Sequence, residues 1–102
     1  MEFKVVFRET FILDLEGIVR RIAFHNPDAG RKLGEIIIAT AESLTFFPER
    51  FPNVRQRPGI RRFIVRKHFK VFYRVDNPRK QFIFCAVGMG GANLIHTFPI
   101  NR

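Results

Sequence analysis

A chain of 102 residues suits one compact domain with a single hydrophobic core, so residues 1–102 are expected to form one domain. The sequence is 46% hydrophobic and contains thirteen Phe, which excludes an intrinsically disordered chain even at a net charge of +9. The single Cys, Cys85, excludes an internal disulfide, and no apolar run is long enough for a signal peptide or membrane span, so we expect a cytoplasmic protein without a membrane partner.

The first residues predict a strand followed by a helix. Residues 3–7, FKVVF, are rich in β-branched and aromatic side chains, as strands are. From Phe11 to Ile22, apolar residues recur at i, i+1, i+4, i+7, i+8 and i+11, which is the stripe of an amphipathic helix. Thr10 is in a position to cap this helix.

A second helix is expected directly after the first. Asn26 is a good N-cap, and Pro27 is favoured at the first helical position. An apolar stripe from Leu33 to Leu44 then continues until Pro48 ends it. Because the connection is short, the two helices should form a hairpin, and residues 49–60 should be an irregular loop.

Three further strands are predicted at 61–66, 69–76 and 81–88, the last two separated by the turn signal DNPRK. The expected fold is therefore α+β, with an N-terminal strand, a helical hairpin and then a three-stranded antiparallel meander. The hairpin should cover one face of the sheet and leave the other face free.

The positive charge is concentrated in one segment. Residues 50–74 hold nine Arg or Lys and no acid, whereas the rest of the chain holds nine basic and nine acidic residues. All of the net charge therefore comes from this segment, which predicts a docking surface for an acidic partner. The alternative is a solvated strand face whose cations protect an edge.

The turn between the second and third predicted strands decides which cations share a face. A turn of two or four residues would group Arg61, Lys70 and Arg74. A three-residue turn would instead group Arg62 and Arg66 with Lys70 and Arg74. The sequence leaves both registers open.

The ordered set of motifs resembles the RelE/ParE family of bacterial toxins. It comprises the strand, a helical hairpin broken at NP, L-x-x-x-P closing the second helix, then IRRF, VFYRVD and a final VG, over about residues 3–90. The resemblance implies the toxin of a type II toxin–antitoxin (plasmid stabilisation) system, neutralised by an acidic or amphipathic antitoxin segment. It also implies a hetero-oligomer with the antitoxin, or a homo-oligomer.

The two branches of this family differ in target. Members of the RelE branch cleave mRNA in the ribosome, and by resemblance Arg61, Lys70 and His96 match three of their catalytic positions. Phe63 and Gly90 stand where that branch has cations. Members of the ParE branch inhibit DNA gyrase and are not nucleases. IRRF and FYRVD are closer to ParE, so we expect a ParE-like toxin, with a RelE-like mRNA endonuclease as the alternative; whether the protein is an enzyme stays open.

The candidate contacts with target or antitoxin are Arg61, Arg62, Arg66, Lys70, Tyr73 and Arg74. Tyr73 either packs in the core or stacks on a substrate, and His96 is either a tail residue or catalytic. A second hypothesis is a non-toxic nucleic-acid-binding module, with cations on phosphates and Phe72 or Tyr73 on bases. No cluster has metal-ligand spacing, and no glycine motif has the form of a phosphate loop, so no metal or cofactor is expected.

Overall fold

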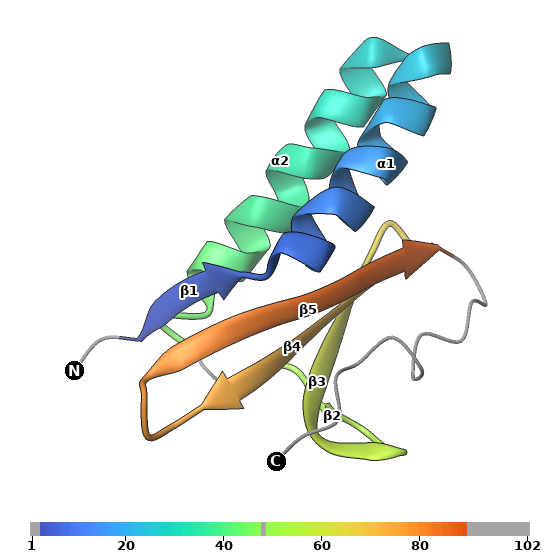
Figure 1. The fold of residues 1–102 in the computed structure, drawn as a ribbon. Helices are drawn as coiled ribbons and strands as arrows, with labels where there is room; N and C mark the ends of the chain where they lie inside the picture. Colours follow the sequence, from blue (N-terminus) through green and yellow to red (C-terminus); the bar gives the residue numbers. More distant parts are fainter. Residues whose placement is uncertain (1–2, 48, 90–102) are drawn as a thin grey trace.

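The computed structural model describes residues 3–47 and 49–89 as one α+β domain (Figure 1). The elements are β1 (Lys4–Phe7), α1 (Glu9–His25), α2 (Pro27–Ser43), β2 (Asn53–Val54), β3 (Arg57–Val65), β4 (Phe69–Asp76) and β5 (Gln81–Met89). The predicted order of strand, helical hairpin and meander is confirmed, with one short additional strand, β2.

The strands form a single sheet in the order β1-β5-β4-β3-β2. The meander β3–β4–β5 is antiparallel, and β1 pairs parallel with β5 from Lys4↔Gln81 to Phe7↔Phe84. Parallel neighbours need a long crossover, and the helical hairpin is part of it. Figure 1 shows both helices on the same side of the sheet.

The helix boundaries follow the local sequence, with one correction. The Asn26 side chain accepts a hydrogen bond of 3.1 Å from the Ala29 N–H, and Pro27 begins α2, as predicted. The prediction that Thr10 caps α1 is wrong, since α1 begins at Glu9 and its capping residue, Arg8, makes no side-chain cap. The Glu9 carboxylate instead lies in the first turn, where the helix dipole favours negative charge.

The two helices are in close contact at Gly30. A Cβ atom on this buried residue would lie 2.8 Å from the Val19 carbonyl oxygen and 3.0 Å from the Ala23 Cβ. One turn later, a Cβ on Gly34 would lie at an ordinary 3.5 Å from a methyl group of Val19. The packing of α2 on α1 therefore depends on the missing side chain at Gly30.

The main core lies between the helical hairpin and the sheet. Its buried members include Phe11, Leu15, Ile18, Leu33, Ile37, Ala41, Phe63, Val65, Val71, Tyr73, Phe82 and Phe84. The predicted helical stripe thus faces the sheet, since the buried residues of α1 are Phe11, Leu15 and Ile18. This burial of apolar surface is the main favourable term in folding.

The other face of the sheet is not free, which corrects a prediction. It carries a second buried cluster of Val54, Ile60, Phe72, Ile83, Cys85 and Ala86. Cys85 and Ala86 both face this side because the β4–β5 register shifts between Phe72 and Tyr73, which leaves one extra residue on β5. Cys85 is a buried thiol that donates to the Ile83 carbonyl.

Part of the predicted loop 49–60 is also sheet. The β3–β4 register begins at Ile60↔Arg74, so Pro58, which lacks an N–H, lies before the first described pair with β4. Residues Asn53 and Val54 pair instead with the start of β3. Proline can occur at the edge of a sheet, where its missing N–H leaves no hydrogen bond unmade. The prolines in this segment therefore did not show that it was a loop.

Tyr73 belongs to the core. Its ring is fully buried and stacks on Phe84 with centroids 5.2 Å apart. The hydroxyl has no hydrogen-bond partner among residues 3–47 and 49–89. Burial raises the pKa of Tyr73 to about 12, and the positive charges of Arg61 and Arg50 oppose this shift only in part. The core-packing alternative is therefore the one that the structure supports.

Gly30→Ala is expected to lower the free energy of unfolding by about 1–3 kcal/mol, because the added methyl overpacks the contact between the helices. Gly34→Ala is the matched control on the same helix, and it should be neutral or stabilising by about 0.5–1 kcal/mol. Urea unfolding of both variants gives the comparison. Equal effects at the two sites would contradict the close approach at Gly30.

Ultraviolet titration can follow Tyr73 alone, since it is the only Tyr and the chain has no Trp. The native protein should form phenolate near pH 12, and the unfolded chain near its ordinary pKa of about 10. The folded pKa is raised, so this contribution to stability is complete below about pH 10 and lost as the pH rises to about 12. Tyr73→Phe should lack this loss. A native midpoint near 10 would show that the ring is accessible to water.

Candidate functional site

The turn between β3 and β4 contains three residues, Arg66, Lys67 and His68. Arg66 and Lys67 have φ values of 54° and 68°, so the chain reverses through two left-handed residues, and Val65 pairs directly with Phe69. Of the two registers that the sequence left open, this is the three-residue one. Because side chains alternate along a strand, this register decides the face of every cation in the hairpin.

We define the basic sheet face as Arg62, Lys70 and Arg74, which lie on the side of the sheet away from the helices. Arg62 is directly opposite Phe72, and Lys70 and Arg74 lie two residues before and after Phe72 on β4. Arg66, predicted to join them, lies exposed in the turn. None of the three has a carboxylate partner in the described part of the chain, where the salt bridges involve only Arg31 and Lys32.

Apolar side chains are interleaved with these cations. Ile64 is opposite Lys70 on the neighbouring strand, and 51% of its surface is exposed. On the other side of Lys70, Gly88 of β5 contributes no side chain. The face therefore offers hydrogen-bond donors and positive charge around an apolar surface, a combination suited to an acidic, amphipathic partner.

The pKa of Cys85 is affected by the positive charges near this face. Burial raises the pKa of the Cys85 thiol, while the positive charges of Arg8, Arg74 and Arg57 oppose the shift. The raised pKa disfavours the thiolate, which is the reactive form of cysteine. The sequence analysis did not place Arg8 or Arg57 near this face. Arg8 follows the first strand, and Arg57 lay in the segment predicted to be a loop.

Arg61 points to the opposite side. It pairs with Tyr73 on β4, and its guanidinium donates a hydrogen bond to the Phe51 carbonyl. Above the Phe51 ring, the Arg50 guanidinium lies 4.8 Å from the centroid. Arg61 therefore holds the segment before β2 against the sheet, and it shares no face with Lys70.

The residues carried over from the nuclease branch are accordingly not assembled by the described residues. Arg61 and Lys70 lie on opposite faces, and Phe63 is in the core, 5.0 Å from the Phe51 ring centroid. His96, Gly90 and Gly91 lie outside the described residues. His25 ends α1 and His68 sits in the turn, so neither belongs to a strand of the basic sheet face.

Two further findings limit the chemistry of the described residues. They include no group of three or more His, Cys, Asp or Glu arranged to hold a metal ion. Within the same residues, no helix has the length and apolar character needed to cross a membrane. The Arg and Lys side chains of the basic sheet face are suited to bind anionic groups, because they are charged hydrogen-bond donors.

Comparisons with known proteins identify the family. The chain is similar to a chain of the chromosomal ParDE TA system from P. aeruginosa (15% identity, 86% of this chain and 96% of that chain, TM-score 0.73). It is also similar to a chain of the RelBE2 toxin–antitoxin complex from Mycobacterium tuberculosis (20% identity, 87% and 99%, TM-score 0.61). A third similar structure is a free double-arginine mutant of the E. coli toxin RelE (14% identity, 96% and 94%, TM-score 0.66).

At these identities the solved structures show a shared fold, and a comparison with curated protein sequences found no match. The family model described as the ParE toxin of the type II toxin–antitoxin system parDE matches residues 5–91. Because that match spans most of the sequence, and the fold agrees with it, the chain belongs to the ParE family of type II toxin–antitoxin toxins.

Proposed function

We propose that this toxin inhibits DNA gyrase, does not cleave ribosome-bound mRNA, and is neutralised by an antitoxin whose acidic segment docks on the basic sheet face. The match to the ParE family supports the first part of this proposal. The observation that carries the second part is the position of Arg61 and Lys70 on opposite faces of the sheet. Both candidate targets are cytoplasmic, so we place the action of the toxin there.

Metal-free cleavage of RNA needs a base for the ribose hydroxyl, cations around the phosphorus and an acid for the leaving oxygen. These groups must converge on one point. Arg61 is engaged with the Phe51 carbonyl on the helix side, and Phe63 occupies a core position in place of a cation. Loss of even one preorganised contact to a developing negative charge commonly costs ~100-fold or more in rate.

An antitoxin is the natural partner of a toxin of this family. The basic sheet face fits an acidic amphipathic segment, because Arg62, Lys70 and Arg74 lack carboxylate partners among the described residues. The exposed Ile64, directly opposite Lys70, adds an apolar contact. Complementary charge speeds association and suppresses wrong partners, while the apolar centre supplies affinity. We propose a hetero-oligomer with the antitoxin on this basis.

The alternative of a non-toxic nucleic-acid-binding module is not supported. It required Phe72 or Tyr73 to stack on bases, but both rings are buried. Base stacking needs an open aromatic face. The family assignment also favours a toxin.

Expression of the chain alone should arrest growth, and the purified protein should inhibit supercoiling by gyrase. Abundant transcripts should remain uncut in primer extension, since the cations needed for cleavage do not converge. The contrary result is codon-phased cutting that disappears in His96→Ala, which would make the protein an RNase and overturn the proposal.

Reversal of Arg62, Lys70 and Arg74 to Glu should weaken antitoxin binding more than about 100-fold, because like charges across an interface cost several kcal/mol. The loss should be largest at low salt. Arg79→Glu, an exposed arginine in the β4–β5 turn, is the control and should bind normally. Calorimetry gives the affinities, and circular dichroism checks the fold. An unchanged affinity in the folded triple variant would remove the basic sheet face as the docking surface.

A further inference from the structure

Three arginines lie close together on the side of the sheet away from the helices, and the antitoxin contact proposed above includes only one of them. Arg8 directly follows β1, Arg57 begins β3, and Arg74 lies on β4. We call these three residues the arginine cluster. They are far apart in the sequence, so only the pairing of the strands brings them to one place.

The backbone of Arg8 places its side chain on this face. Arg8 is extended (φ −67°, ψ 152°), and its N–H donates to the Phe84 carbonyl at 3.2 Å, so Arg8 lies beside Cys85 on β5. Val6, two residues earlier, packs against the buried cluster on the face away from the helices. Because side chains alternate along an extended chain, Arg8 points to the same face as Val6.

Arg74 and Arg57 reach this region from the other side of β5. Arg74 lies directly opposite Ile83 of β5, and Arg57 lies directly opposite Val54 of β2. Both of these apolar residues belong to the buried cluster on the face away from the helices. Directly opposed residues of an antiparallel pair point to the same face, so both arginines point there as well.

The three positive charges act on one atom, the Cys85 sulfur. Burial raises the pKa of Cys85, and the charges of Arg8, Arg74 and Arg57 all act to lower it. This agrees with the strand register, which places Arg8 and Arg74 on the two strands that flank β5. Each arginine is half-buried, so part of its stem is packed against the sheet.

Carboxylates do not neutralise the charges at the two ends of this cluster. Among the described residues, the salt bridges involve only Arg31 and Lys32, so Arg8 and Arg74 have none. The one acid of β4, Asp76, accepts the N–H of Arg79 at 3.2 Å. The cluster therefore offers guanidinium groups above an apolar surface to an anion from solution.

We propose that the arginine cluster binds phosphate groups of the DNA backbone, so that the toxin contacts the DNA on which gyrase acts as well as the enzyme. The choice of DNA rests on the proposed function, whereas the choice of phosphate rests on the side chains. A planar guanidinium donates two parallel hydrogen bonds to a phosphate, which a lysine does not do. The net charge of +9 also favours a polyanion as the partner.

The contact is with the backbone and not with the bases. Phe72, the aromatic residue of the buried cluster on this face, is only 4% exposed, so its ring offers no surface on which a base can stack. Phosphate contacts carry no sequence information by themselves. The toxin is therefore expected to bind duplexes of different sequence with similar affinity.

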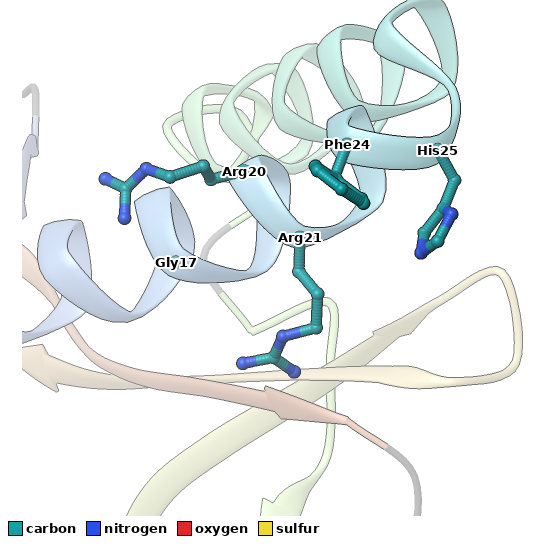
Figure 2. Close-up of a pocket in the computed structure, with 5 residues that line it drawn as sticks. All are labelled: Gly17, Arg20, Arg21, Phe24 and His25. Carbon is teal, nitrogen blue, oxygen red and sulfur yellow. The ribbon is translucent and has the colours of Figure 1, made fainter.

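Replacement of each arginine by glutamine tests the charge. In fluorescence anisotropy with a short labelled DNA duplex at about 0.1 M salt, Arg8→Gln, Arg57→Gln and Arg74→Gln should each weaken binding about 5–10-fold. The dependence of log affinity on log salt should become shallower by about 1 for each variant. Arg20→Gln is the control, because Arg20 is an exposed arginine of α1 on the helix side of the sheet (Figure 2). Its affinity should change less than about twofold.

Replacement by lysine separates a phosphate site from general attraction. Arg8→Lys and Arg74→Lys keep the charge but lose the planar fork, so each should weaken DNA binding about threefold or more, whereas Arg20→Lys should not. Circular dichroism checks that the variants are folded. Cluster variants that bind DNA as well as the Arg20 variants would overturn the inference. Tighter binding of an RNA duplex of the same sequence would overturn the assignment to DNA.

Gyrase supercoiling assays with the same proteins separate this inference from the proposed function. If the toxin inhibits gyrase but the cluster variants retain full DNA affinity, the inference fails and the proposed function stands. If the toxin binds DNA through the cluster but does not inhibit gyrase, the proposed function fails and the cluster remains a phosphate site. The two failures are therefore distinguishable with one set of variants of the full-length toxin.

Discussion

The register between β3 and β4 is the constraint on which the chemistry of the two faces of the sheet depends. Side chains alternate along a strand, so a turn one residue shorter or longer would move the cations of β3 to the other face relative to those of β4. The three-residue turn at Arg66–His68 places Arg62, Lys70 and Arg74 away from the helices. It also sends Arg61 to the helix side, where it binds the Phe51 carbonyl. The same register thus concentrates charge for a partner and disperses the residues that RNA cleavage would need.

The two faces of the sheet consequently have different chemistry. The face toward the helices is apolar and aromatic, with Tyr73 stacked on Phe84, and its single buried hydroxyl lacks a partner among the described residues. The other face has a smaller buried cluster around Phe72, ringed by cations.

The two helices of the hairpin also differ in how their glycines and charges are placed. At Gly30 a missing side chain lets α2 contact α1, whereas at Gly17 a missing side chain faces solvent. The charges follow the same division, because those of α2 are paired within the helix and Arg20 and Arg21 are not. The inner side of α1 thus packs in the core, and its outer side is exposed.

The sequence by itself determined the order of the elements, the break between the helices at Asn26 and Pro27, and the confinement of net charge to residues 50–74. These are local properties, set by periodicity, capping and composition. Only the tertiary structure decided the number of turn residues, the burial of Tyr73 and the binding of Arg61 to Phe51. The alternation of side chains along β3 and β4 is the same in either register, so it cannot reveal the number of turn residues. The hydrogen bond from Arg61 to the Phe51 carbonyl joins residues ten apart, and it leaves no local sequence pattern. The identity of the site therefore depends on long-range pairing, which composition and spacing do not encode.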